Sequence, residues 1–87
     1  MTEQALIHDS VAALIPRLQS RALSAAAVAE ACLARIDARE AAVGAWQFLD
    51  RVAVRRAAAE LDSGPVRGVL HGVPVGIKDI IDVAGWP

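Results

Sequence analysis

The chain has 87 residues, enough for one small domain at the low end of what can bury an adequate core alone. Hydrophobic residues make up 55% and charged residues 22%, which excludes a disordered tail. Nine basic residues face ten acidic ones and aromatic residues reach only 3%, so neither nucleic acid nor an anionic membrane is an expected partner.

Further function classes are excluded by single features of the sequence. One cysteine, Cys32, rules out an intrachain disulfide framework and a multi-cysteine zinc site. No apolar run reaches the roughly 18 residues of a membrane span. The start, Thr2-Glu3-Gln4, lacks the charged and apolar regions of a signal peptide. We therefore expect a cytoplasmic protein.

An apolar stripe near the N-terminus predicts a first helix. Its face is formed by Ile7, Val11, Leu14, Ile15 and Leu18. Pro16 lies inside this pattern. Because proline removes a backbone donor and clashes with the preceding turn, we expect a kink or a break there.

A second helix is predicted from Ser24 to Gly44. Ser24 can cap its first turn, and Leu23 can contact Val28 as a hydrophobic staple. Gly44 is a typical helix end. Cys32 has the helical phase of Val28, so we expect it to be a small buried hydrophobic residue rather than a nucleophile.

A third helix is predicted to begin after Asp50, which can cap it. Its apolar face would consist of Val54, Ala57, Ala58 and Leu61. Before it, Trp46 and Phe48 alternate with a polar residue, which predicts a short strand over residues 45–49. We expect Trp46 to pack in the core, with a role as a partner anchor as the alternative.

The composition changes after residue 63, where glycine and proline replace alanine. A strand is predicted over residues 75–78, with Pro74 at its start. A helical part, residues 1–63, followed by a strand and loop block, residues 64–87, predicts an incomplete α/β domain. Because its strands would have unpaired edges, we expect the isolated chain to fold poorly or to associate.

Lys78 is the only lysine of the chain and lies in its most apolar run. Lysine, unlike arginine, can lose its proton when it is desolvated, and the neutral amine then acts as a base near neutral pH. Gly76 would leave room beside it for a backbone or a ligand. The alternative is an exposed lysine at a strand end, with its head in water or paired with Asp79 or Asp82.

The other candidate residues favour structural roles. His71 precedes a glycine in a loop, where we expect structural hydrogen bonds; a role as base or ligand is the alternative. The glycines at 64, 68, 72 and 76 lack the spacing of a phosphate loop. None of the serines lies in a glycine-flanked elbow. With neither metal-ligand spacing nor a dinucleotide fingerprint, no metal and no cofactor are expected.

Segment 70–85, with Leu70-His71-Gly72 at its start and Lys78-Asp79 within it, resembles the N-terminal block of enzymes of the amidase signature family. The predicted second helix, and the alanine-rich third helix that closes on Asp62, are similar to that family as well. The resemblance implies an α/β fold in which a mixed sheet is flanked by helices. Residues 1–87 would be the N-terminal part of a single amidase domain that ends just after the catalytic-lysine block.

The family's chemistry is amide hydrolysis by a triad of a serine, a second serine on a cis peptide, and a lysine. By resemblance, Lys78 is the triad lysine. Its neutral amine would take a proton from the bridging serine, which would take one from the nucleophilic serine. Both serines normally lie downstream of this block, so we expect an N-terminal fragment that is inactive alone.

The resemblance implies a small carboxamide substrate, converted to a carboxylate and ammonia or an amine, and it leaves open a homodimer of the full-length protein. Within the class, the alternatives are the glutamine-hydrolysing subunit of a tRNA-dependent amidotransferase and an allophanate hydrolase-like enzyme. From another class, the alternative is a non-catalytic helical interaction module.

Overall fold

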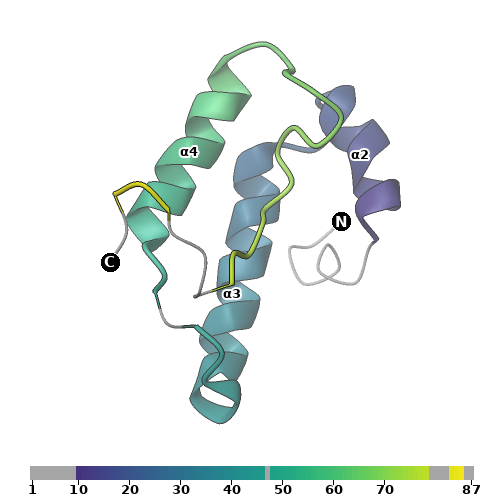
Figure 1. The fold of residues 1–87 in the computed structure, drawn as a ribbon. Helices are drawn as coiled ribbons and strands as arrows, with labels where there is room; N and C mark the ends of the chain where they lie inside the picture. Colours follow the sequence, from purple (N-terminus) through teal and green to yellow (C-terminus); the bar gives the residue numbers. More distant parts are fainter. Residues whose placement is uncertain (1–9, 47, 79–82, 86–87) are drawn as a thin grey trace.

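The computed structural model describes residues 10–46, 48–78 and 83–85. Within these ranges the chain forms three helices: α2 over Val11–Gln19, α3 over Ala25–Val43 and α4 over Arg51–Ser63. In Figure 1, α2 and α4 both lie beside the N-terminal part of the long helix α3, whose C-terminal end extends beyond them. The segment that follows α4 returns along α3, so its residues face the helices that precede them in the chain.

Helix α2 is capped by Ser10, a residue the sequence analysis did not single out, and it continues through its proline. Ser10 Oγ accepts a hydrogen bond from the backbone N–H of Ala13 at 3.1 Å. Pro16 lies inside the helix, which extends to Gln19, so of the two expected outcomes the break does not occur, and the kink stays a prediction. Leu14 and Leu18 are buried on either side of Pro16 and hold both parts of the helix against the core. Ile7 lies outside the described residues.

Both predicted ends of α3 are confirmed. Ser24 Oγ accepts from the N–H of Ala27 at 3.0 Å, as an N-cap does. Gly44 adopts φ +61°, a left-handed conformation that glycine tolerates, and its N–H donates to the carbonyl of Glu40 at 2.7 Å. Ser24 and Gly44 were therefore sufficient to predict where α3 begins and ends.

Helix α4 also begins where predicted, with Asp50 Oδ1 accepting from the N–H of Ala53 at 3.0 Å. On its predicted apolar face, Ala58 is buried, and Val54 and Leu61 are partly buried. Ala57 lies at the edge of that face and is exposed.

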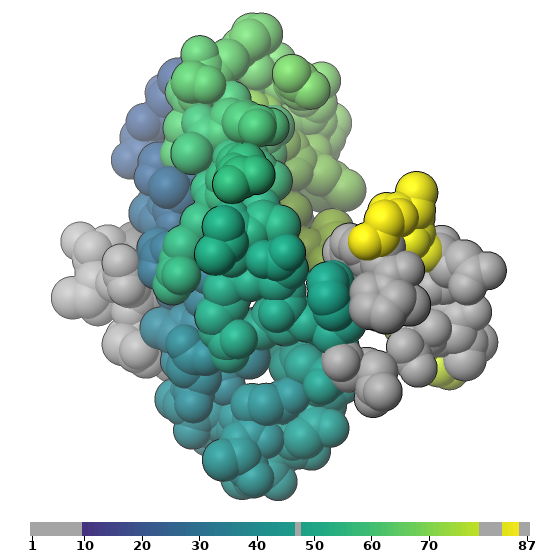
Figure 2. Space-filling view, turned by 90° about the vertical axis from the view of Figure 1, so that its left-hand side faces the viewer, coloured from purple at the N-terminus to yellow at the C-terminus, as the bar shows by residue number. Residues whose placement is uncertain are grey.

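Two apolar clusters hold the helices together. The first joins α2 to α3 and contains Leu14, Leu18, Val28 and Ala31, with Leu23, Ala27, Cys32 and Val73 packed against it. The second joins α3 to α4 and contains Ala25, Ala29 and Ala58, with Val54 and Leu61 packed against it. Small alanine side chains allow the two helices to approach closely. Figure 2 shows α4 covering one face of the molecule, with the end of α3 projecting beyond it.

Two ion pairs connect the exposed faces of α3 and α4. Arg55 Nε lies 2.5 Å from Glu30 Oε1, and the guanidinium of Arg51 pairs with Asp37. All four side chains are between about two-fifths and one-half exposed, so screening by water and salt limits their contribution to stability. The apolar clusters are therefore the main link between the helices.

The predicted strand over residues 45–49 was wrong for the residues that the structure describes, of which none lies in a strand. The reason is local. The carboxylate of Glu40 accepts hydrogen bonds from the N–H groups of Ala45 at 2.8 Å and Trp46 at 2.7 Å. A side chain on α3 thus occupies the donors that a ladder would need. Trp46 is 41% exposed, so the prediction that it packs in the core was also wrong.

The predicted strand over residues 75–78 is likewise not formed, although all four residues are described. A strand requires a neighbour for its ladder, and the described parts of the chain form helices and irregular segments only. The α/β class predicted from the sequence is therefore not visible within these ranges. No helix among the described residues has the length and apolar character needed to cross a membrane.

Candidate functional site

Lys78 lies at the end of an irregular segment and is exposed. Two residues before it, Gly76 lies against Trp46: a Cβ at Gly76 would be 3.6 Å from Trp46 Cη2. The room predicted beside this glycine is thus bordered by the indole ring. The sequence left two environments open for Lys78, a desolvated one and an exposed one. In the structure of this chain Lys78 is exposed. Asp79 and Asp82, its two considered ion-pair partners, lie outside the described residues.

An apolar groove with a volume of about 680 Å³ borders the segment that leads to Lys78. Its walls come from α3, α4, the connection between them and residues 74–76. Trp46, Phe48 and Val75 line it together with Cys32 and Ile36 of α3. Such a surface can accept apolar groups of a ligand or of another protein segment.

Cys32 is a half-buried residue of this groove rather than a reactive thiol. Burial raises the pKa of the Cys32 thiol above its usual range. The thiolate is the nucleophilic form of cysteine, and a raised pKa reduces its population near neutral pH. Cys32 packs against the cluster of α2 and α3 as the prediction of a small hydrophobic residue requires, but it is partly rather than fully buried.

His71 has the structural hydrogen bond that was predicted for it. The side chain is 8% exposed, and its Nδ1 accepts from the backbone N–H of Arg67 at 3.2 Å. The N–H of His71 itself donates to the carbonyl of Gly68 at 3.2 Å. No group of three or more histidine, cysteine or acidic side chains that could hold a metal ion occurs in the described part of the chain.

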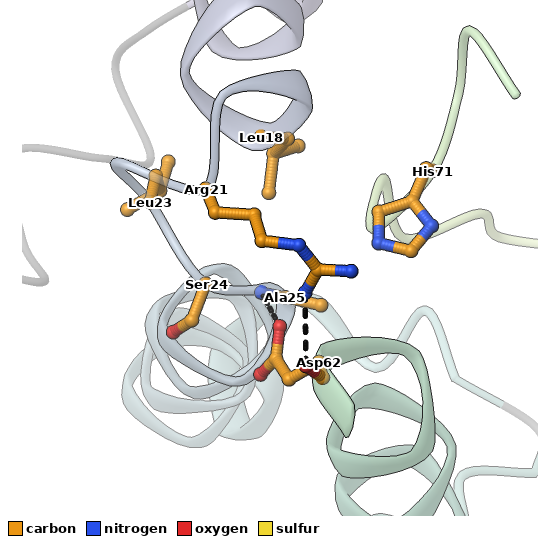
Figure 3. Close-up of a pocket in the computed structure, with 7 residues that line it drawn as sticks. All are labelled: Leu18, Arg21, Leu23, Ser24, Ala25, Asp62 and His71. Carbon is orange, nitrogen blue, oxygen red and sulfur yellow. Dashed lines mark hydrogen bonds between the residues drawn. The ribbon is translucent and has the colours of Figure 1, made fainter. Parts of the chain in front are cut away.

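A second cavity, of about 270 Å³, lies where the end of α2, the start of α3 and the end of α4 meet (Figure 3). Arg21 extends from the turn between α2 and α3, and its guanidinium donates to the backbone carbonyl of Asp62 at 2.9 Å and to that of Gly64. In return, the carboxylate of Asp62 accepts from the N–H groups of Ala25 at 2.7 Å and Ala26 at 3.0 Å. Hydrogen bonds thus run in both directions between the α2–α3 turn with the start of α3 and the end of α4.

Sequence reasoning did not identify Arg21 or Asp62 as important. The sequence does contain a signal for Asp62. A carboxylate in the last turn of a helix lies near the partial negative charge of the helix C-terminus, which is unfavourable, so its presence there suggests a hydrogen-bond or charge partner on another element. That partner is the N-terminus of α3, where a negative charge is favourable. Glu40 near the end of α3 carries the same signal, and it binds Ala45 and Trp46.

The loop after α4 is attached to the same region. Gln19 Nε2 donates to the carbonyls of Gly68 at 2.5 Å and Val69 at 3.4 Å. Gly72 adopts φ +82°, and a Cβ there would lie 3.0 Å from Leu18 Cδ2 and 3.2 Å from Ala25 Cβ. The close approach of the backbone to α2 and α3, together with its positive φ, favours glycine at this position.

Comparisons with known proteins place these features in a family. The sequence model described as "Amidase" matches residues 27–87, a range that includes the groove and Lys78. An acylamidase of Rhodococcus erythropolis is 41% identical over 100% of this chain and 19% of its own length. An amidase of Pseudomonas putida is 36% identical over 94% of this chain and 18% of its own length.

A glutamyl-tRNA(Gln) amidotransferase subunit from Chloroflexus aggregans is 40% identical over 100% of this chain and 18% of its own length. The chain therefore spans about one-fifth of the length of these relatives. No solved structure matches it significantly. Since the family model covers well over half of the residues, the chain belongs to the amidase family.

Proposed function

We propose that this chain is the part of an amide hydrolase that supplies its general base, Lys78. The observation that carries the proposal is the match to the amidase family over residues 27–87, which contains the lysine-aspartate pair of the family's N-terminal block. Lysine suits the role because its amine can be neutral when it is dry, whereas a guanidinium stays charged.

In the proposed reaction, Lys78 Nζ takes a proton from a bridging serine. That serine takes the proton of a nucleophilic serine, whose oxygen attacks the amide carbon. The proton returns through the same groups to the leaving nitrogen, so that an acyl-enzyme and an amine or ammonia result; water then releases the carboxylate. Lys78 is exposed in this chain, so the mechanism requires that further parts of a longer protein desolvate it.

The chain's own serines support the proposal that the nucleophile comes from elsewhere. Each of the four hydroxyl groups bonds to backbone within three residues of itself. Ser10 and Ser24 accept from N–H groups of α2 and α3, and Ser20 and Ser63 donate to the carbonyls of Arg17 and Glu60. We therefore propose that the chain alone does not hydrolyse amides.

The test uses the complete protein that the gene encodes, assayed with simple carboxamides and with glutamine. Lys78→Ala should lower kcat by about 100-fold or more, the contribution of a general base. Lys78→Arg should be equally impaired because its guanidinium does not deprotonate. Arg39→Ala, which removes an exposed cation of α3, is the matched control and should leave kcat unchanged. Full activity of Lys78→Ala would refute the proposal.

The substrate is a separate part of the proposal. The chain is 41% identical to the acylamidase and 40% identical to the amidotransferase subunit, so identity does not separate a free carboxamide from glutamine as the substrate. Hydrolysis of simple carboxamides without any other subunit would identify an amidase. Glutamine hydrolysis that requires both tRNA and a partner protein would identify an amidotransferase. A cytoplasmic location and a homodimer of the full-length protein stay predictions.

A further inference from the structure

We infer that Arg21 is a positioning residue for Lys78, acting through the α2–α3 junction (residues 18–25) and the Lys78 segment (residues 65–78). The inference rests on the proposed function of Lys78. It concerns how the chain holds the lysine in place and assigns no contact between Arg21 and substrate.

Arg21 has an unusual backbone conformation. Its φ of +63° is the only positive value of a non-glycine residue within the described ranges. This region is unfavourable for residues that have a Cβ, and such strain persists only where surrounding contacts enforce it. Backbone hydrogen bonds close the turn, from the N–H of Arg21 to the carbonyl of Leu18 at 3.2 Å and from the N–H of Leu23 to the carbonyl of Arg17 at 3.1 Å. The guanidinium adds two hydrogen bonds, to the carbonyls of Asp62 and Gly64 (Figure 3 shows the first). An arginine at this position supplies a planar donor that reaches both carbonyls at once.

The Lys78 segment begins at the residue after Gly64 and contains neither helix nor strand. Its course is therefore set by individual contacts, and these converge on the α2–α3 junction. Arg21 holds the carbonyl at its start. Gln19 holds the carbonyl of Gly68, and Gly72 rests on Leu18 and Ala25.

Further along, Val73 packs against the cluster that joins α2 to α3, and Gly76 lies against Trp46. Lys78 follows two residues later. Because the contacts of Gly68, Gly72 and Val73 all rest on the α2–α3 junction or the cluster beside it, we expect a shift of that junction on loss of Arg21 to displace the segment that carries Lys78. A general base depends on its distance from the proton it accepts, and displacement by about 1 Å can cost about 100-fold in rate.

The experiment uses Arg21→Gly in the complete protein. Glycine adopts φ +63° without strain, so the turn is retained while the two-pronged donor is lost. We expect kcat to fall about tenfold with KM within about twofold, because the base is displaced and substrate binding is not. Millimolar guanidinium should restore part of the lost kcat in Arg21→Gly and none in Lys78→Ala. Arg56→Ala, which removes an exposed cation of α4, is the control and should match the parent.

Arg21→Lys is a second variant in case the first folds poorly. Its ammonium keeps the charge but cannot reach both carbonyls in a fixed plane, so we expect a kcat between those of the parent and Arg21→Gly. An unchanged kcat in Arg21→Gly, with Lys78→Ala inactive, would overturn the inference alone. A lower melting temperature and lower activity without guanidinium rescue would also overturn it, because that pattern indicates a purely structural role. An active Lys78→Ala would overturn the proposed function as well.

Discussion

At the scale of single residues, Gly72 has the tightest requirement in the described chain. A Cβ at this position would meet Leu18 Cδ2 at 3.0 Å and Ala25 Cβ at 3.2 Å, on a backbone with φ +82°. Gly72→Ala should therefore lower the free energy of unfolding by about 2 kcal/mol, through both strain and overpacking. Urea unfolding measures the change. Gly68→Ala is the matched control, because a Cβ there has nothing within 4 Å; equal effects of the two variants would contradict this account.

Cys32 provides a residue-scale prediction about pH. Burial raises the pKa of its thiol, so the folded chain keeps this proton at pH values where the unfolded chain has begun to lose it. Stability that depends on Cys32 should be fully present below the pKa of the unfolded thiol and should decline as the pH rises toward the folded value. Alkylation by iodoacetamide at about pH 8, near the ordinary pKa of a thiol, should be slower in the folded chain than in urea. Equal rates would show that the thiol is freely accessible and ionises normally.

At the scale of elements, the sequence predicted helix ends correctly and strands incorrectly. Ser24, Asp50 and Gly44 each bond to backbone within a few positions, so the physical cause of each helix end is visible in a short window of sequence. A strand depends on a neighbour that a local pattern does not specify. At residues 45 and 46, the carboxylate of Glu40 takes the free N–H groups instead.

The sequence separation between interacting residues also explains which parts of the candidate site could be predicted. Lys78 was identified from its neighbours and from the resemblance of its block to a family. The hydrogen bonds of Arg21 to Asp62 and of Gln19 to Gly68 span 41 and 49 positions. No periodic pattern connects such distant residues, so these contacts became visible only in the folded chain.

Asp62 gives the prediction for the interaction between elements. Its carboxylate satisfies the first two N–H groups of α3, so Asp62→Ala should lower the free energy of unfolding by about 2 kcal/mol, as expected for charged hydrogen bonds to backbone. Glu60→Ala is the matched control, because it removes an exposed carboxylate from the same helix and should stay within about 0.5 kcal/mol of the parent. Thermal unfolding monitored by circular dichroism compares the two. Similar losses would mean that the cap on α3 contributes little.

At the scale of the whole molecule, the chain has an exposed apolar surface beside its candidate base. Trp46 and Ile77 are each 41% exposed and Val75 is 72% exposed, and all three lie near the groove between α3 and α4 or on the segment that borders it. Because exposed apolar surface can mark an interaction site, we expect this one to contact another protein segment. The isolated chain is still only expected to associate; we now predict that it would do so through this apolar groove rather than through the strand edges considered from the sequence.

Val75 allows this expectation to be tested. Val75→Asp places a charge at the groove and should reduce both concentration-dependent association of the 87-residue chain and its binding of a hydrophobic dye. Val52→Asp is the matched control, because Val52 is 63% exposed on α4 and does not line the groove. Sedimentation velocity over a range of concentrations measures the association. If the parent chain sediments as a monomer throughout, or if both variants reduce association equally, the groove is not the surface through which the chain associates. A selective effect of Val75→Asp would instead assign association to the face that carries the Lys78 segment, the same face that the proposed mechanism requires to be covered.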